Sequence, residues 1–253
     1  MLAPAPSPIA IDRLVKRYKT VTAVDGISFT IEAGSCTALL GGNGAGKTTT
    51  ISTIMGLVEP TSGHVTVLGV EMPRHRHRVL HRMNFESPYV NMPMRLTVRQ
   101  NLNVFGMLYG CDDIAGRIRA LSEEFDMGEF LDRPAGKLSA GQKTRVAVAK
   151  SLINDPEILL LDEPTASLDP DTADWVRGRL EHYRRERGAT VLLASHNMSE
   201  VERLCDRVIM LKQGKIEDDD TPAGLIARYG RSNLEEVFLD IARGTGEARE
   251  AAQ

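Results

Sequence analysis

The sequence predicts an α/β fold whose core is a mostly parallel sheet covered by helices. Short apolar segments with strand patterning are separated by longer segments of helical periodicity, and this alternation is typical of such sheets. Residues 73–150 have helical periodicity, which predicts an inserted α-helical lobe at about residues 88–150. The 253 residues are enough to bury a core without disulfide or metal support.

The predicted strands follow one another along the chain. Residues 9–18 mix apolar and charged side chains like a half-exposed edge strand, and residues 23–31 alternate more regularly. We expect them to begin an N-terminal antiparallel β subdomain. Residues 36–40 are a short apolar strand, which a glycine-rich turn connects to a helix that ends near Met55. Further strands are predicted at residues 64–70, 157–161, 190–194 and 207–211.

Composition indicates how the chain is divided. Residues 1–8 are a Pro- and Ala-rich extension, residues 9–242 form one domain that contains the lobe, and residues 243–253 are a charged tail that we expect to be disordered. No apolar run approaches the roughly 18 residues that cross a bilayer. The sequence therefore predicts a protein without a membrane span of its own.

Charge and cysteine content exclude several classes of protein. The net charge of −3 argues against a dedicated nucleic-acid partner, because such domains are strongly basic. The three cysteines, Cys36, Cys111 and Cys205, are too far apart to predict a disulfide framework or a metal cluster, and they indicate a reducing, cytosolic compartment. Alternating Arg and His at residues 74–82 suggest a metal site or an anionic-lipid patch, but a solvated helix face is favoured, since the arginines would repel a cation.

A glycine-rich loop after the first fully apolar strand matches the pattern G-x-x-x-x-G-K-[ST]. Its residues are Gly41, Gly42, Asn43, Gly44, Ala45, Gly46, Lys47 and Thr48, and Thr49 follows them. Glycines let successive backbone N–H groups point into one concavity, and the helix that follows adds the positive end of its dipole. Lys47 can reach the β- and γ-phosphates of a nucleotide, and the Thr48 hydroxyl can bind Mg²⁺. Because a chance match is expected in only about one such chain in a hundred, the loop predicts a nucleotide site.

Polar residues follow two of the later strands. Asp162 ends an apolar strand and is expected to hold Mg²⁺ through water, while Glu163 is placed to act as a general base on the attacking water. His196 follows the strand at residues 190–194 and can contact the γ-phosphate and orient that water. An acidic turn or a single histidine in such a position is usually structural. The phosphate loop in the same chain favours the functional interpretation.

One further motif indicates a family. Leu138, Ser139, Ala140, Gly141 and Gln142 open a predicted helix whose first N–H groups, with the Ser139 hydroxyl, can bind a phosphate. Together with the preceding motifs, they make residues 9–241 resemble the ATP-binding cassette of an ABC transporter. The family signature reads close to LSGGQ, so Ala140 is a small departure.

The resemblance implies ATP and Mg²⁺ as cofactors and an ATPase that works as a dimer, with a second copy of itself or a homologous cassette. Two protomers would sandwich two ATP molecules, each held by one phosphate loop and by Ser139, Gly141 and Gln142 of the facing protomer. Asp169 lies in a segment that matches the D-loop, which couples the two sites. Tyr18 lies where the family stacks an aromatic ring on adenine, although a surface or core tyrosine is the alternative.

The chain departs from the family at the entry to the helical lobe. Most cassettes have a glutamine there that binds Mg²⁺ and the attacking water, but residues 84–89 contain none. Either Glu86 or Ser87 replaces it, or the metal contact at this position is lost. We also hypothesise that residues 86–89 contact the permease, because Pro88 stiffens the segment and Tyr89 offers a large amphipathic surface.

The resemblance also implies a separately encoded membrane permease. The cassette would then lie on the cytoplasmic side of the plasma (inner) membrane, attached through that permease. Residues 221–239 resemble the ends of stand-alone cassettes of the ABC-2 export type, which serve permeases for drugs, lipids or polysaccharides. Export is therefore favoured over import, and a soluble ABC ATPase without a transport role is the alternative function.

Overall fold

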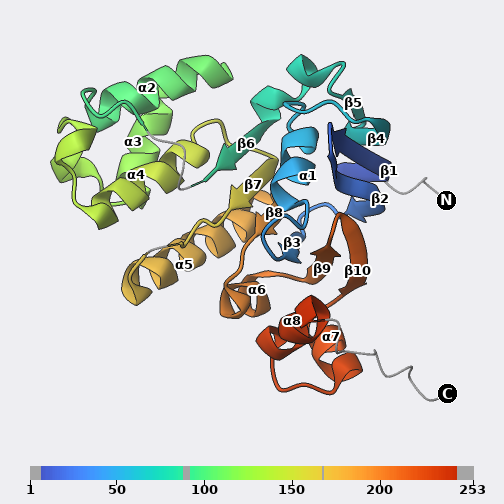
Figure 1. The fold of residues 1–253 in the computed structure, drawn as a ribbon. Coiled ribbons are helices and arrows are strands. Elements are labelled where there is room, and N and C mark those ends of the chain that lie inside the picture. Colours follow the sequence, from blue (N-terminus) through green and yellow to red (C-terminus); the bar gives the residue numbers. More distant parts are fainter. Residues whose placement is uncertain (1–6, 88–91, 167, 244–253) are drawn as a thin grey trace, which may run out of the picture. The chain divides into compact units, whose positions relative to one another are not determined.

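The structure is a computed structural model that describes residues 7–87, 92–166 and 168–243 (Figure 1). These residues form two compact units. The first contains the described residues up to Val79 and those from Thr190 onward, and the second contains those of Leu80–Ala189. The predicted extension and tail lie mostly outside the described residues, and the predicted lobe at residues 88–150 falls within the second unit.

The first unit begins with an antiparallel sheet of strand order β2-β1-β4-β5. Its strands are β1 (Ile9–Tyr18), β2 (Val21–Ile31), β4 (Ser62–Val67) and β5 (Val70–Met72). The expected N-terminal antiparallel region is present, but the expectation of an edge strand at residues 9–18 is wrong. Strand β1 is hydrogen-bonded to β2 on one side and to β4 on the other. Its charged residues reflect an exposed face, because alternate side chains of a strand point to opposite faces.

The strand predicted at residues 64–70 is two strands. Leu68 and Gly69 have φ values of 48° and 75°, and Val67 pairs with Val70. Two consecutive left-handed residues are typical of a tight hairpin turn, so the chain reverses and β5 returns beside β4. A leucine in that conformation gives no turn signal in the sequence, which explains the error.

A second set of strands in the first unit has the order β10-β9-β3-β8. Strand β3 (Cys36–Gly41) is buried throughout and is parallel to both β8 (Thr190–Ala194) and β9 (Arg207–Lys212). The antiparallel strand β10 (Lys215–Asp220) was not predicted, because its acidic sequence lacks an apolar alternation. Arg207 pairs with Asp219 on this strand, and such pairs compensate its charge. The helices of this unit are α1 (Lys47–Ile54), α6 (Met198–Leu204), α7 (Pro222–Tyr229) and α8 (Leu234–Arg243).

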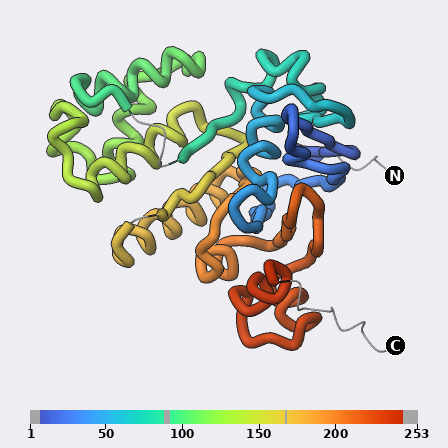
Figure 2. Tube along the Cα trace, viewed as in Figure 1, coloured from blue at the N-terminus to red at the C-terminus, as the bar shows by residue number. Residues whose placement is uncertain are grey.

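The second unit contains a parallel pair of strands and the helical region. Strand β6 (Met83–Glu86) pairs with β7 (Ile158–Asp162), and the helices are α2 (Val98–Tyr109), α3 (Ile114–Glu124), α4 (Ala140–Ser151) and α5 (Pro170–Arg187). In the Cα trace of Figure 2, the green to yellow segment carries α2, α3 and α4. Strand β6 lies in the stretch predicted to be helical. Four residues are too few to show a period of two, and the pairing partner is distant in sequence.

Local sequence explains where these helices begin and end. Thr97 and Gln100 form a capping box at the start of α2, which ends at the left-handed Gly110.

The basic residues at 74–82 form two short 3₁₀ turns, Arg76–Arg78 and Leu80–Arg82, in place of the helix face that was expected. Among the described residues, no helix is both long and apolar enough to cross a membrane.

Candidate functional site

The phosphate loop connects β3 to α1 in the first unit. Gly44 and Gly46 have φ values of 76° and 108°, and Gly46 directly precedes α1. These conformations are open to glycine and strained for other residues. The Lys47 ammonium donates to the carbonyl oxygens of Gly41 and Gly42, at 2.6 Å and 3.2 Å, so the side chain folds back over the loop. The loop thus places a cation beside the first N–H groups of a helix, which is an arrangement suited to phosphate.

The exposure of the loop residues matches a ligand-binding role. Gly42, Asn43 and Gly44 are exposed, as is the side chain of Thr48, whereas Ala45 is buried and anchors the loop. A pocket of about 220 Å³ lies beside the loop and is lined on its other side by Phe238 and Ile241 of α8. The sequence did not indicate that a C-terminal helix would lie there.

Gly46→Ala is expected to lower the free energy of unfolding by about 1–3 kcal/mol, since the residue is left-handed. A Cβ atom at Gly46 would lie 2.5 Å from the carbonyl oxygen of Ala23, so backbone must also shift. Gly42→Ala is the matched control, because a Cβ there meets nothing within 4 Å. Urea denaturation of both variants without nucleotide measures the difference, and equal stabilities would contradict the strained geometry.

His196 follows β8 in the same unit as the phosphate loop. Leu39 of β3 pairs with Ala194 of β8, and the two strands are parallel. Their carboxyl ends therefore meet at one edge of the sheet, which brings His196 to the same edge as the loop. Ser195, directly before it, donates to a carboxylate oxygen of the buried Glu200 at 2.8 Å and so anchors the turn. The His196 side chain is exposed.

Tyr18 ends β1 and is 45% exposed, which leaves part of its ring available for stacking. The Lys16 ammonium lies 5.0 Å from the ring centroid. This cation–π contact orients the ring and brings positive charge near any group that stacks on it. The position is compatible with the expected contact to adenine, which stays a prediction.

The two predicted carboxylates lie in the second unit, at the end of β7. Asp162 is the last residue of the strand, and Glu163 has a left-handed φ of 56°. Both are half-buried. The Ala166 N–H donates to the Glu163 carbonyl oxygen at 3.0 Å, which closes a tight turn. A left-handed glutamate is uncommon, and such strain is concentrated at functional sites.

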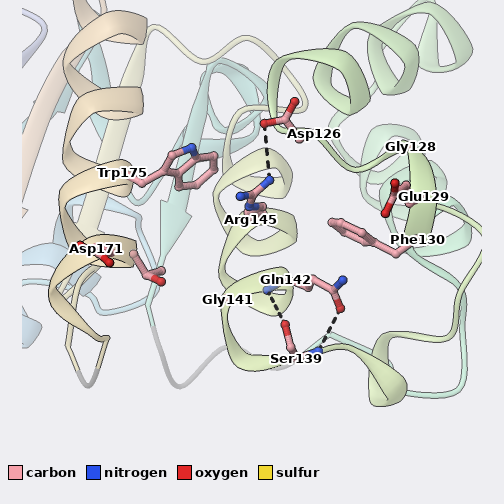
Figure 3. A pocket seen from close by; sticks show the side chains of 11 residues that line it. Asp126, Gly128, Glu129, Phe130, Ser139, Gly141, Gln142, Arg145, Asp171 and Trp175 are labelled. Atoms are coloured by element: carbon pink, nitrogen blue, oxygen red, sulfur yellow. Dashed lines mark hydrogen bonds and ion pairs between the residues drawn. The ribbon is translucent and has the colours of Figure 1, made fainter.

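The signature residues open α4 in the same unit. Ser139 is its N-cap, and it forms a capping box in which Gln142 N–H donates to Ser139 Oγ at 3.2 Å and Ser139 N–H donates to Gln142 Oε1 at 3.1 Å (Figure 3). Because a hydroxyl that accepts a bond still has its own hydrogen to donate, Ser139 can serve an anion at the helix start. Ser139 is exposed, and Gly141 provides no side chain that would cover the helix end.

A pocket of about 820 Å³ lies beside the signature, between residues of α4, of α5 and of the segment after α3. Figure 3 shows Arg145 below Asp126, with Trp175 to its left. The Arg145 guanidinium lies 5.1 Å from the ring centroid of Trp175 and 3.5 Å from an Asp126 oxygen. Sequence reasoning missed this cluster, because the three residues belong to separate segments of the chain.

Asp169 caps α5, whose first residue is Pro170. Its carboxylate accepts hydrogen bonds from the backbone N–H and the hydroxyl of Thr172, at 3.0 Å and 2.7 Å. These bonds favour the charged form and lower the pKa of Asp169. The residue assigned to the D-loop is therefore an ionised, exposed helix cap in the protomer.

Glu86 ends β6 and points into the helical region, where its carboxylate lies 2.7 Å from the ammonium of Lys150 on α4. The two residues are only 7% and 3% exposed. Burial raises the pKa of Glu86 to about 7, and the charge of Lys150 opposes that shift. Phe105 covers the ammonium at 5.2 Å from its ring centroid. A carboxylate engaged in this way argues against Glu86 as the replacement for the missing glutamine, which leaves Ser87 or loss of the metal contact as the alternatives.

The expected site residues thus fall into two groups. The phosphate loop, Tyr18 and His196 belong to the first unit, and Asp162, Glu163, the signature and Asp169 belong to the second. Pro88 and Tyr89, which we expected to contact the permease, lie outside the described residues. Within the described part of the chain, no cluster of three or more His, Cys, Asp or Glu side chains could hold a metal by itself.

Comparisons with known sequences agree with these motifs. The sequence profile of the ABC transporter family matches residues 24–166. The Nod factor export ATP-binding protein I of Ralstonia nicotianae is 37% identical over 234 residues, which cover 92% of this chain and 73% of that protein. The protein of the same name from Rhizobium meliloti is 40% identical over 222 residues, which cover 86% of this chain and 66% of that protein.

Solved structures agree as well. The ATP-binding subunit of an ABC transporter superposes with a TM-score of 0.84 at 25% identity, covering 93% of this chain and 99% of that one. The cbiO1 protein of Clostridium perfringens, part of the ABC transporter complex cbiONQ, has a TM-score of 0.78 at 29% identity and covers 94% and 97%. A bacterial ABC transporter cassette in a dimeric structure has a TM-score of 0.75 at 25% identity and covers 84% and 98%. The chain therefore belongs to the ABC transporter family and is an ATP-binding, ATP-hydrolysing subunit of a transporter.

Proposed function

We propose that this subunit drives export through a separate membrane permease and hydrolyses Mg-ATP at composite sites between two cassettes. The observation that carries the proposal is that the chain has two open anion-binding helix starts. The phosphate loop precedes α1 with its Gly42–Gly44 backbone exposed, and the exposed Ser139 opens α4. Each can bind phosphate by the same physics, so one ATP can bridge a loop and a facing signature.

The roles of the loop residues follow from their chemistry. Lys47 pairs with the β- and γ-phosphates in place of the two carbonyl oxygens that it contacts now. Tyr18 stacks on the adenine ring. Thr48 and Asp162 would hold Mg²⁺, since a hydroxyl and a carboxylate are the oxygen donors this ion prefers. The bound ion would neutralise charge on the phosphates.

Hydrolysis requires a base and an oriented water molecule. Glu163 accepts the proton of the attacking water, and its left-handed φ of 56° begins the tight turn directly after the strand. His196 contacts the γ-phosphate and helps to position that water. Loss of the γ-phosphate removes the bridge between the facing protomers, so the closed dimer opens and the permease changes orientation.

Export is supported by the relatives, which are named Nod factor export ATP-binding proteins. We assign the cargo only to the broad class of drugs, lipids or polysaccharides. The cassette would work at the cytoplasmic face of the inner membrane, attached through its permease. Purification of the tagged chain from membranes should recover a polytopic membrane protein that stimulates its ATPase. Recovery only from the soluble fraction, with no such partner, would favour an ABC ATPase without a transport role.

Ser139→Arg is expected to abolish turnover by blocking the facing γ-phosphate, although ATP still binds the phosphate loop. Mixing this variant with Lys47→Ala protein should restore part of the activity, because the mixed dimer retains one intact composite site. ATPase assays of each variant alone and of the mixture measure this. Wild-type turnover by Ser139→Arg alone would show that the signature does not act across a dimer.

A further inference from the structure

Two cysteines that lie 169 residues apart in the sequence meet in the core of the first unit. Cys36 Sγ and Cys205 Sγ are 3.4 Å apart, which is direct contact between thiols. The residues are 3% and 7% exposed. Their wide spacing in the sequence predicts two separate thiols. The sequence does not show that the start of β3 lies beside the end of α6.

The backbone holds this contact in place. Thr37 and Arg207 are paired residues of the parallel strands β3 and β9. Cys36 directly precedes Thr37 and Cys205 lies two residues before Arg207, so the two cysteines are diagonal neighbours. Asp206 fixes the arrangement twice. Its N–H donates to the Cys36 carbonyl oxygen, and its carboxylate accepts from the Cys36 N–H, both at 2.8 Å.

This geometry needs little change to form a covalent bond. A disulfide has its sulfurs about 2 Å apart, and the 3.4 Å contact shows that the two side chains already point toward each other. The sulfurs must approach each other by about 1.4 Å, a shift within the reach of side-chain rotation.

We propose that Cys36 and Cys205 are a redox-active dithiol that hydrogen peroxide converts into a disulfide. One thiol attacks an oxygen of the peroxide, the O–O bond breaks, and water leaves, which forms a sulfenic acid. The second thiol attacks that sulfur, the S–O bond breaks, and a second water leaves as the S–S bond forms. The two thiols lose two electrons and two protons, and the peroxide is reduced to two water molecules.

The surroundings determine which oxidant can act. The Cys36 contact, burial and the nearby carboxylates Glu200 and Asp206 raise the pKa of Cys205, which disfavours the thiolate and slows its oxidation. Burial also excludes bulky disulfides such as oxidised glutathione. Hydrogen peroxide, the smallest peroxide, is therefore the oxidant that fits, and the pair stays reduced until it accumulates.

The position of the pair indicates what the bond would do. Cys36 begins β3, whose other end leads into the phosphate loop, and Cys205 follows α6, whose other end follows His196. The bond would lie at the far end of both elements from the nucleotide residues. It would stabilise the folded chain by restricting the unfolded one while leaving the ATP site unchanged.

The test uses the full chain with Cys111→Ser, which removes the remaining, half-buried thiol. After treatment with hydrogen peroxide, we expect non-reducing peptide mapping to find the Cys36 and Cys205 peptides joined. The apparent melting temperature should rise by about 5 °C or more and return when dithiothreitol is added. The same treatment of Cys36→Ala and Cys205→Ala variants, in the same background, should produce neither change.

Three results would overturn the proposal. Both thiols could remain alkylatable after denaturation of the peroxide-treated protein, or one could become a sulfinic acid without any link. Formation of the link with loss of ATPase activity would disprove the claim that the bond leaves the site unchanged. A joined peptide, a higher melting temperature and unchanged ATPase together would establish the dithiol.

Discussion

Glu163→Gln is expected to lower the ATP turnover number by about 100- to 10,000-fold while ATP binding persists, because the amide cannot accept the proton of the attacking water. With hydrolysis blocked, Mg-ATP should hold the protein as a dimer, which gel filtration detects.

Lys47→Ala should behave differently from Glu163→Gln. Loss of a charge-assisted contact to the phosphates weakens ATP binding by roughly 10- to 100-fold, so no ATP-dependent dimer should form.

Glu186→Gln is the matched control for Glu163→Gln, since Glu186 is an exposed carboxylate on α5 in the same unit. The control should hydrolyse ATP at the wild-type rate. Wild-type turnover by Glu163→Gln itself would remove Glu163 as the general base. An ATP-dependent dimer of Lys47→Ala would show that the loop lysine is dispensable for binding.

Lys150→Met is expected to lower the free energy of unfolding by about 3–5 kcal/mol, because it leaves the Glu86 carboxylate buried without its cation. Glu86→Leu combined with Lys150→Met should recover most of that loss, since no charge is then buried. Urea denaturation of the two variants provides the comparison. Arg99→Met is the control, because Arg99 forms an equally short pair with Asp132 at an exposed position and should change stability little.

The effect of Lys150→Met should depend on pH. In the folded wild type the pKa of Glu86 is raised from 4.5 to about 7, so the folded state binds a proton more tightly than the unfolded state. The tighter binding of this proton stabilises the folded state fully at pH values below the unfolded pKa of 4.5. This stabilisation is lost as pH rises through about 7. Without Lys150 the penalty on the charged carboxylate grows. The variant should therefore be closest to wild type at about pH 5 and furthest from it at about pH 8, and equal differences would contradict the pairing.

The ion pair of Glu86 and Lys150 also connects strand β6 to helix α4. Helix α4 begins after Ser139 and its twelve residues rise about 18 Å to Lys150 and Ser151. One end therefore presents the signature, and the other is tied to the end of β6. A rigid helix anchored in this way couples the position of the signature to that of Glu86 at the end of β6.

Much of the nucleotide site was predictable because its information is local. Left-handed glycines, a lysine and a hydroxyl in adjacent positions determine the phosphate loop between β3 and α1 wherever the strand itself is placed. The capping box of Ser139 and Gln142 likewise needs only residues three apart. The parallel strands β7 and β8 were found because each is a short apolar run bounded by polar residues.

Other features were decided only by the tertiary structure. Strand β6 exists because β7 pairs with it, and the acidic β10 exists because β9 and basic side chains stabilise it. The contacts of Glu86 with Lys150 and of Cys36 with Cys205 join residues that are far apart in the chain. The sequence by itself determined the local structure of the two short segments that we propose bind phosphate, since their hydrogen bonds close within a few residues. Only the folded chain decided which buried charges and thiols meet, because burial and contact at those positions depend on the packing of distant segments.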